Sequence, residues 1–336
     1  MKILYVAEAI DGSRALQRFN ALKKLYANAQ LFLYENNQYG INGGGSLVYK
    51  VAYKLRRPLE YNEVNRRLIT VISKLRPEIT FFEKCLALRP KTYAHSRNIG
   101  SINIALYEDD ICLKHNSSVY LDRSLKYLDY VFTTKEKNVG QELHKKGANK
   151  SFLVVPSFCD QVFTLKHECP DSHQFQYDVS FIGTYESERA DYILNLLKNG
   201  IPVHIWGNGW SKIKHPKLSL HPALYEKDYK DIIIISKINL CFLRKKNRDS
   251  ITSRSIEIPA SGGFMLAEDT KRHRDVFGNN SVGFFTRKDE LLSQVHYFLK
   301  NERLRVEMAK SANSIIRNKN MTHEDLFKNI FKVLQQ

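Results

Sequence analysis

The sequence predicts two doubly wound α/β domains, each with a mostly parallel sheet between helices. Three observations support this fold class. Short apolar runs alternate with segments of helical period along the whole chain. The 336 residues exceed the roughly 100–200 residues of one ordinary domain. The alternation also breaks after Pro156 and restarts with a new apolar run at Val179, which indicates a boundary between two units.

In the first half, strands are expected at runs rich in branched and aromatic residues: Ile3–Ala7, Leu31–Tyr34, Ile79–Phe82, Ile102–Tyr107, Tyr130–Thr133 and Phe152–Val155. Helices are expected where apolar residues recur at helical spacing: Ala15–Tyr26, Tyr61–Leu75 and Lys135–Lys145. Gly147 follows the last of these and is a plausible C-cap.

The second half repeats this alternation. Strands are expected at Val179–Ile182, Val203–Trp206, Ile238–Phe242, Gly263–Ala267 and Val282–Phe285. Helices are expected at Glu186–Lys198, Tyr229–Ser236, Thr252–Ala260, Glu290–Lys300, Glu302–Arg317 and Glu324–Leu334. We assign residues 1–160 to a first domain, 161–177 to a linker and 178–320 to a second domain. Ligands of such sheets bind at the carboxyl ends of the strands, so the two domains are expected to face one cleft lined by strand-to-helix loops.

Composition excludes several classes of protein. Hydrophobic residues make up 43% and charged residues 26%, as in globular proteins. No apolar run reaches the roughly 18–20 residues of a transmembrane helix, and the run at Ile3–Ala7 is too short for a signal-peptide core. The five cysteines are widely spaced, which favours reduced thiols and a cytoplasmic location. His167, Cys169 and His173 lie in a polar stretch that favours a surface loop, so no metal site is expected.

Three loops of the first domain hold candidate residues. Gly12 and Ser13 precede a helix, where they could bring an amide to a substrate or serve as a plain N-cap. The Gly43–Ser46 run favours a flexible loop over a gate for an acceptor. Asp109 and Asp110 end a strand, where a carboxylate could deprotonate a substrate hydroxyl or simply be solvated.

The second domain has a denser set of candidates. Gly183 and Tyr185 form a turn before a helix that carries Arg189. The Trp206–Trp210 loop, which contains Gly207, could stack on a base or sugar ring or could plug the domain. A third loop contains Arg244, Lys245, Asp249, Ser253 and Arg254 before a helix, a pattern suited to a diphosphate. Glu257 follows one turn later and is placed to accept a ribose hydroxyl.

These residues carry a family resemblance. Asp249 and Glu257 are separated by seven residues, which resembles the E-x(7)-E pattern of retaining glycosyltransferases of the GT-B fold, with aspartate at the first position. The segments Phe181–Tyr185, Trp206–Trp210, Arg254–Glu268 and Met321–His323 look like the spore-maturation-type (CgeB-like) branch of the family 4-like glycosyltransferases. The similarity covers residues 178–325 well and is weak in the first half.

The resemblance implies a donor site in the second domain and an acceptor site on the first. Glu257 would hold the ribose, and Arg244, Lys245, Arg254 and the Ser253 amide would hold the diphosphate. Asp249 would contact the sugar through a shorter side chain than the family's glutamate. The last helix, within residues 321–336, would cross back to the first domain.

We therefore expect a metal-independent glycosyltransferase that uses a nucleotide-diphosphate sugar as co-substrate and needs no cofactor. Retention would need no strong enzymatic base, whereas inversion would make Asp109 or Asp110 the base. The alternatives are a non-catalytic basic binding protein and a nucleotide-sugar epimerase on the same fold.

The formal charge of +17 points to anionic partners. Residues 50–91 hold 11 Lys and Arg against 4 Asp and Glu, either as a solvated helical face or as a contact with anionic lipid or a phosphate-bearing acceptor. No nucleic-acid partner is expected, because no basic stripe carries interleaved aromatics. A glycan or lipid-linked acceptor and a peripheral position at the inner membrane face are the corresponding expectations.

Overall fold

The computed structural model describes residues 1–36, 47–164 and 175–336. The chain forms two compact units. Unit 1 comprises Met1–Val155, Lys246–Arg248 and His323–Gln336, and unit 2 comprises Pro156–Lys245 and Asp249–Thr322. The sequence-based division placed the end of the first domain at residue 160, whereas the first segment of unit 1 ends at Val155.

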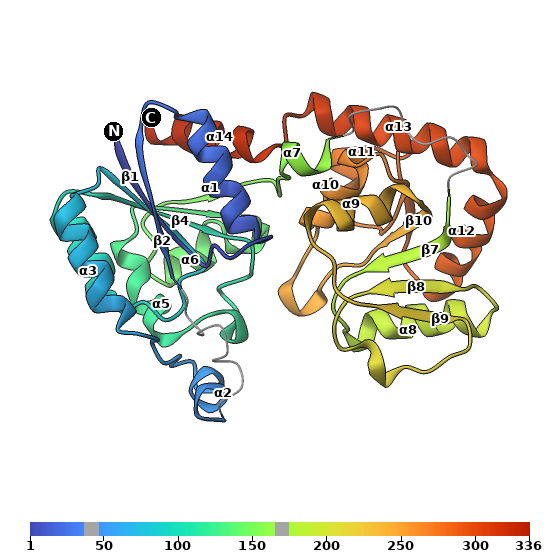
Figure 1. Ribbon diagram of the computed structural model, residues 1–336, viewed down its shortest axis with the longest axis horizontal. Helices are drawn as coiled ribbons and strands as arrows, with labels where there is room; N and C mark the ends of the chain where they lie inside the picture. Colours follow the sequence, from blue (N-terminus) through green and yellow to red (C-terminus); the bar gives the residue numbers. More distant parts are fainter. Residues whose placement is uncertain (37–46, 165–174) are drawn as a thin grey trace. The chain divides into compact units, whose positions relative to one another are not determined.

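Unit 1 contains a six-stranded sheet in the order β2-β1-β3-β4-β5-β6 (Figure 1). All neighbouring strands are parallel. The strands are β1 (Lys2–Ala7), β2 (Gln30–Glu35), β3 (Ile79–Glu83), β4 (Ile102–Tyr107), β5 (Tyr130–Thr133) and β6 (Ser151–Leu153). The order reverses between β1 and β3, so the loops after these two strands open the crevice where doubly wound sheets bind ligands.

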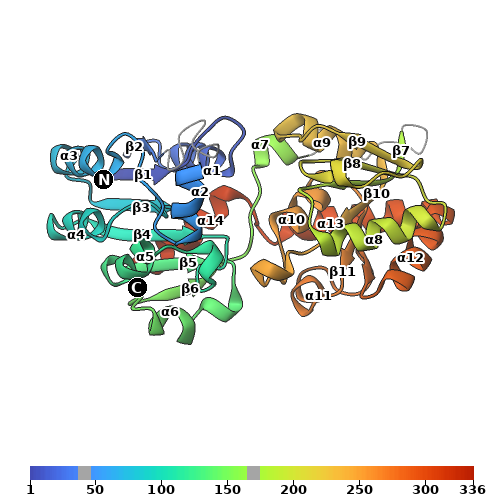
Figure 2. The same ribbon diagram turned by 90° about the horizontal axis from the view of Figure 1, so that it is seen from below.

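Helices cover both faces of this sheet (Figure 2). Along β1, Leu4 and Val6 pack with one set of helices, while Ile3 and Tyr5 pack with the other, as the two-residue period of a strand requires. The α-helices that precede unit 2 in the chain are α1 (Arg14–Leu25), α2 (Leu47–Lys54), α3 (Val64–Leu75), α4 (Pro90–Asn98), α5 (Val119–Ser124) and α6 (Gln141–Lys145). Short 3-10 turns lie at η1 (Lys114–Asn116), η2 (Leu125–Tyr127) and η3 (Glu136–Asn138).

The final helix, α14 (His323–Leu334), belongs to unit 1 although unit 2 precedes it in the sequence. Its apolar side enters the core on the same face of the sheet as α1. The ring of Phe327 lies 5.7 Å from the ring of Phe81, and the ring of Phe331 lies 4.6 Å from that of Tyr26. The chain therefore starts and ends in the same unit.

Unit 2 contains a second parallel sheet of six strands in the order β12-β11-β10-β7-β8-β9. The strands are β7 (Tyr177–Ile182), β8 (Val203–Trp206), β9 (Leu218–His221), β10 (Ser236–Cys241), β11 (Met265–Glu268) and β12 (Gly283–Phe285). Counted from β7, this is the 3-2-1-4-5-6 order of dinucleotide-binding folds, with its reversal between β7 and β10. Its α-helices are α7 (Asp160–Phe163), α8 (Ser187–Lys198), α9 (Glu226–Ile234), α10 (Ser253–Ala260), α11 (Lys271–Phe277), α12 (Lys288–Lys300) and α13 (Glu302–Asn318).

The predicted fold class of two doubly wound α/β units is confirmed. The sequence did not predict several short elements, of which α4 shows the reason most clearly. Three of its nine residues are buried, and two of those are Thr92 and Ser96, so its core-facing side carries no apolar period. Among the described residues, no helix is long and apolar enough to cross a membrane.

We predict that Phe327→Ala lowers the free energy of unfolding of unit 1 by about 3–5 kcal/mol. The fully buried ring of Phe327 contacts Tyr5 and Phe81, and truncation leaves a cavity that these strand residues cannot fill. Urea denaturation followed by near-ultraviolet circular dichroism measures the change. Asn329→Ala, on the exposed side of α14, is the matched control, and an equal loss in both variants would show that α14 is not docked through this side.

Candidate active site

The sequence-predicted residues of the second domain gather at the carboxyl edge of the unit 2 sheet, where the strand order reverses. Gly183 and Tyr185 follow β7, and Arg244 follows β10. Helix α8 then packs on one face of the sheet and α10 on the other. The two loops therefore diverge at this edge and leave it open for a ligand.

The loops after β7 and β8 are held together through their backbones. The amide of Tyr185 donates to Asn208 O at 2.9 Å, and the indole Nε1 of Trp210 donates to Gly183 O at 2.8 Å. Gly207 has a φ of +155°, and a Cβ there would lie 2.2 Å from Gly183 O. Only glycine allows this approach, so Gly207 positions the turn that follows β7.

Helix α10 begins at Ser253 with a fixed orientation. Its N-cap Thr252 and Ser255 form a capping box. Ser255 Oγ lies 2.7 Å from His273 Nε2, and His273 Nδ1 lies 2.7 Å from Glu268 O. A carbonyl can only accept, so Nδ1 carries the proton and Ser255 donates to Nε2. Burial lowers the pKa of His273 to about 4, which keeps the imidazole neutral in this role.

Three arginines meet beside the start of α10. Burial lowers the pKa of Arg189, which is 3% exposed, and the positive charges of Arg254 and Arg244 lower it further, against the opposing effect of Glu186. The side chain of Arg254 lies beside Gly183, because a Cβ added to that glycine would be 3.4 Å from Arg254 Nη2. Among the described residues, Nε of Arg254 and Nε and Nη2 of Arg189 are buried without a hydrogen-bond partner. Such donors are costly, and an anion would satisfy them.

Two acids lie at the rim of this arginine group. Arg244 Nε donates to Glu186 Oε1 at 2.8 Å, and Arg189 Nη1 lies 3.9 Å from the same oxygen. Lys245 Nζ is 4.0 Å from Glu188, and both side chains are exposed. The second pair is too exposed to contribute much stability. Glu186 is thus a carboxylate partner shared by two of the three arginines.

The remaining predicted donor residues lie on the same loop and helix. The Asp249 amide donates to Arg244 O, and the Asp249 carboxylate accepts from the Arg244 amide, both at 3.2 Å. This exchange closes the loop between the two residues. Glu257 is 3% exposed on α10, and Ser253 provides the first amide of that helix. Their assigned contacts with ribose and diphosphate stay predictions.

Both tryptophans are buried, which favours the structural interpretation of their loop over stacking on a ligand. Trp206 is 4% exposed, and its ring stacks on His221 with 4.4 Å between centroids. Trp210 is 2% exposed and packs edge-on against Tyr185 and Phe181. The stacking of Trp206 on a donor stays a prediction, and in this structure its ring packs with His221 and Tyr177.

The two predicted catalytic aspartates belong to unit 1 and differ in environment. Asp109 is partly exposed, with Oδ2 3.6 Å from Lys84 Nζ. Asp110 is fully buried, with one oxygen accepting from the Cys112 amide and the other paired with Arg248. Both carboxylate oxygens of Asp110 are engaged and no solvent reaches it, so this environment favours Asp109 over Asp110 as a base. The catalytic role of either aspartate stays a prediction.

The other first-domain candidates have simpler roles in the described structure. Ser13 is the N-cap of α1 and accepts from the Leu16 amide at 3.2 Å, and Gly12 precedes it with a φ of +75°. The plain N-cap alternative accounts for both, and their contact with an acceptor stays a prediction. The Gly43–Ser46 loop and the His167, Cys169 and His173 set lie outside the described residues.

A buried ion network in unit 1 was not predicted. Arg18, 3% exposed on α1, pairs with Glu83 and, at 3.1 Å, with Glu108. Burial alone would lower the pKa of Arg18, but Glu108 and Glu83 outweigh it and raise that pKa. Burial lowers the pKa of His323, at the start of α14, and the nearby positive charge of Arg18 lowers that pKa further. The sequence did hold a signal, since Arg18 shares the apolar side of its helix with Ala15, Phe19 and Leu22.

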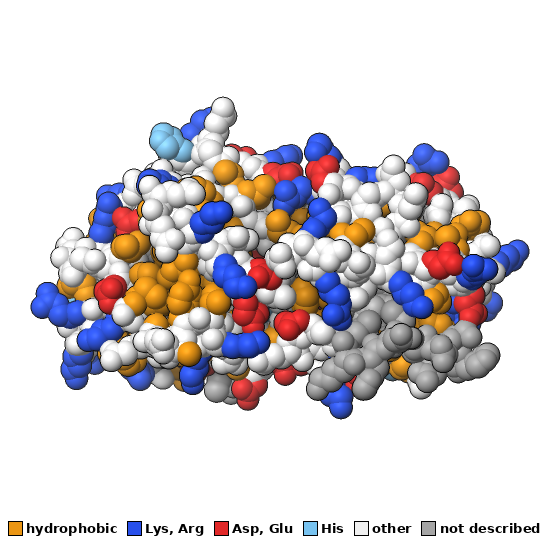
Figure 3. Space-filling view, turned by 90° about the horizontal axis from the view of Figure 1, so that it is seen from above, with side chains coloured by type: hydrophobic (Ala, Val, Ile, Leu, Met, Phe, Trp, Pro, Cys, Tyr) orange, Lys and Arg blue, Asp and Glu red, His pale blue; other side chains and the backbone are white. Residues whose placement is uncertain are grey.

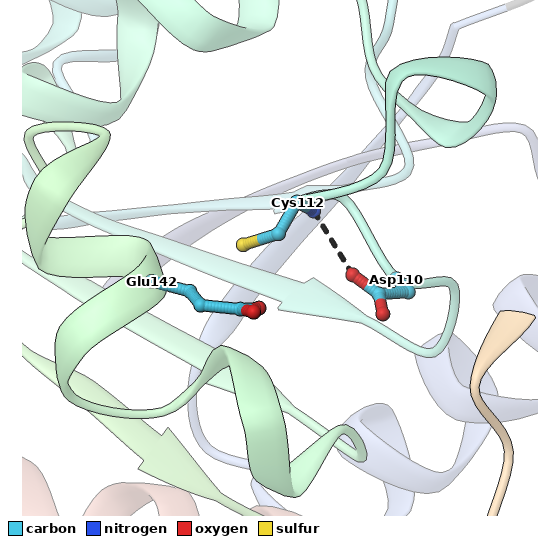
Figure 4. A group of neighbouring side chains, drawn as sticks. All are labelled: Asp110, Cys112 and Glu142. Atoms are coloured by element: carbon cyan, nitrogen blue, oxygen red, sulfur yellow. Dashed lines mark hydrogen bonds between the residues drawn. The ribbon is translucent and has the colours of Figure 1, made fainter.

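One cluster of unit 1 has the composition of a metal site. Ligand atoms of Asp110, Cys112 and Glu142 lie within 4.8 Å of one another (Figure 4). Arg248 already supplies the positive charge, because it pairs with Asp110 and donates to both oxygens of Glu142 at 2.9 and 2.7 Å. Burial, with a smaller effect of Glu142, raises the pKa of Cys112 to about 12, so its sulfur stays a thiol. In this structure the cluster is therefore an ion-paired group in which Arg248 neutralises both carboxylates.

Comparisons with known proteins agree with the strand order. Residues 189–330, less than half of the chain, match a family model described as "Glycosyl transferase-like". A sucrose-phosphate synthase from Thermosynechococcus elongatus aligns with a TM-score of 0.68 and 9% identity, over 99% of each chain. HepE from Anabaena, solved with UDP and glucose, aligns with a TM-score of 0.67 and 9% identity, over 100% of this chain and 99% of HepE.

The fold is the GT-B fold. The same fold is shared by a Listeria monocytogenes protein assigned as a UDP-N-acetylglucosamine 2-epimerase, with a TM-score of 0.55, 11% identity, and coverage of 93% of this chain and 91% of that one. Identities near 10% establish the fold only. The comparison with curated protein sequences yields no match.

We predict that stability falls between pH 6.5 and pH 4 in part because of His273. Its pKa is about 4 in the folded protein and 6.5 in the reference state, so the unfolded chain binds the additional proton in this window. Its contribution is complete above pH 6.5 and declines by about 3 kcal/mol towards pH 4. Urea denaturation across this range measures it, and His273→Gln should flatten the curve. The exposed His296→Gln variant should retain the wild-type slope.

Proposed function

We propose that the protein is a glycosyltransferase that transfers a sugar from a nucleotide-diphosphate sugar to an acceptor hydroxyl. The observation that carries the proposal is the group of Arg189, Arg244 and Arg254 beside the start of α10, with buried donors of two of them unpartnered among the described residues. A helix start adds partial positive charge to these guanidiniums. The group suits a diphosphate, and the family match over residues 189–330 supports the transferase assignment.

The proposed role of the arginines follows from where negative charge develops during sugar transfer. When the bond between the sugar C1 and the diphosphate oxygen breaks, negative charge grows on the leaving diphosphate, and the arginines stabilise it. The acceptor oxygen forms the new bond to C1 and loses its proton. We propose retention, in which a departing phosphate oxygen takes this proton, in keeping with the spacing of Asp249 and Glu257. Glu257 holds the ribose and Asp249 contacts the sugar in this proposal.

The acceptor and the location are further parts of the proposal. The basic surplus of residues 50–91 supports an anionic acceptor such as a phosphate-bearing glycan or a lipid-linked glycan. We propose a reaction without a metal ion, because arginines can neutralise the diphosphate. We also propose that the protein acts in the cytoplasm, in keeping with its widely spaced cysteines. Figure 3 shows basic side chains scattered among acidic ones on the face that it presents, which gives no support to a nucleic-acid stripe.

An epimerase is the second candidate, because the fold is shared with the Listeria protein. It would use the same donor site but would invert one sugar carbon without an acceptor. Product analysis separates the two functions, since an epimerised sugar differs in configuration at a ring carbon whereas transfer or hydrolysis releases free nucleoside diphosphate.

We predict that Arg254→Gln weakens the binding of UDP by about 10- to 100-fold, because it removes one charge-assisted contact to the diphosphate. Calorimetry with UDP, GDP and ADP first identifies the nucleotide, and the variant is compared on that ligand. The free nucleoside should lose little affinity, since it lacks the phosphates. Arg303→Gln removes the same charge from a side chain that is 93% exposed in unit 2 and should bind as wild type. An absence of binding by every nucleotide would reject the donor site.

We predict that the sugar released from the bound nucleotide sugar keeps its anomeric configuration, and that Asp109→Ala retains turnover within about tenfold of wild type. Retention needs no enzymatic base, whereas loss of a true base costs roughly 10²–10⁴-fold. Nuclear magnetic resonance of the anomeric proton, recorded before mutarotation, reports the configuration. The opposite anomer together with an inactive Asp109→Ala variant would establish inversion with Asp109 as the base.

A further inference from the structure

Helix α2 presents large apolar side chains to solvent. None of its eight residues is buried. The exposed fractions are 76% for Leu47, 63% for Val48 and 46% for Val51. Leu55, directly after the helix, is 65% exposed, and its amide donates to Val51 O, so it continues the last helical turn. These values far exceed those expected for a helix that packs its apolar side on a core. In Figure 1 the helix lies at the edge of unit 1.

The exposed apolar residues share one side of the helix. At 100° per residue, Leu47, Val48, Val51 and Leu55 fall within about a third of its circumference. The half-buried residues of the helix, Tyr49 and Ala52, lie outside this stripe, and the half-buried Arg56 follows the end of the helix. The helix therefore packs on unit 1 through the side that holds Tyr49 and Ala52 and turns its apolar stripe outward.

This orientation is fixed by contacts at the end of the helix. Arg56 pairs with Asp122 through its side chain, and its carbonyl accepts from the Val119 amide at 2.8 Å. The hydroxyl of Tyr53 donates to His115 O at 3.5 Å. Because the end of α2 is tied to α5 and η1, its outward side cannot simply rotate into the core.

Basic residues border the apolar stripe. Lys50 and Lys54 are exposed and, at 100° per residue, lie on the helix surface beside Leu47, and the exposed Arg57 follows the end of the helix. No acidic residue occurs between residues 47 and 57. Exposed apolar residues flanked by lysines and arginines are typical of helices that lie in the surface of an anionic bilayer.

We infer that α2 attaches the protein to the surface of a bilayer that contains anionic lipid. The apolar stripe enters the boundary between headgroups and acyl chains, while Lys50, Lys54 and Arg57 contact lipid phosphates. A second copy of the chain is disfavoured as the occupant, because two such helices would bring like charges together. The inference concerns a surface of unit 1 and does not depend on the donor chemistry of unit 2.

Vesicle binding by the full-length chain tests the inference. Wild type should co-sediment with vesicles of phosphatidylglycerol and phosphatidylcholine, and much less with phosphatidylcholine alone. Leu47→Glu with Leu55→Glu should reduce partitioning by at least about tenfold, because it places charge in the inserted stripe. Tyr225→Glu with Tyr297→Glu is the matched control, since it makes the same change in charge at residues that are 64% and 49% exposed in unit 2.

Each outcome decides the inference. Loss of binding in the α2 variant alone supports it, provided that UDP affinity and thermal stability match wild type. Equal loss in both variants shows that net charge, rather than α2, drives attachment and overturns it. Absence of wild-type binding overturns it as well. If sedimentation velocity shows a wild-type dimer that only the α2 variant disrupts, the stripe is an interface between copies instead.

Discussion

Buried positive charge at the carboxyl edge of the second sheet is the constraint on which the site depends. Arg189 is almost fully buried beside Arg254 and Arg244, and burial and these neighbours all lower its pKa. Like charges in a poorly hydrated place are unfavourable, so the arrangement is tolerated only if an anion compensates it. Glu186 supplies part of this compensation at the rim. A bound diphosphate would supply the rest, which links the local electrostatics of unit 2 to donor binding.

The ion network of unit 1 shows why burial alone does not identify a functional arginine. Arg18 is as buried as Arg189, yet Glu83 and Glu108 pair with it and raise its pKa. Its role is to join α1 to the sheet close to α14. Arg248 is likewise neutralised by Asp110 and Glu142. Arg18 and Arg248 therefore have carboxylates that neutralise them, whereas buried donors of Arg189 and Arg254 have no hydrogen-bond partner among the described residues.

Backbone geometry and hydrogen bonds hold this site in place. Gly207 allows the loops after β7 and β8 to touch, and the bonds from Ser255 to His273 and on to Glu268 fix the start of α10. The Gly207 contact joins the two loops, and the bonds of His273 join α10 through α11 to the end of β11. The arginines are consequently positioned by groups that never need to contact the ligand, which is how a rigid α/β scaffold supports a binding site in its loops.

The sequence by itself determined the order of the strands other than β9, because residues buried on both faces of a parallel sheet form apolar runs such as Ile3–Ala7. It also determined the basic loop from Arg244 to Arg254, whose charges are local in the chain. Only the tertiary structure decided which charges are paired. It paired Asp110 with Arg248, 138 residues away, and buried the Trp206 ring against His221 and Tyr177. Such pairings depend on contacts across the fold, and neither spacing nor composition records them.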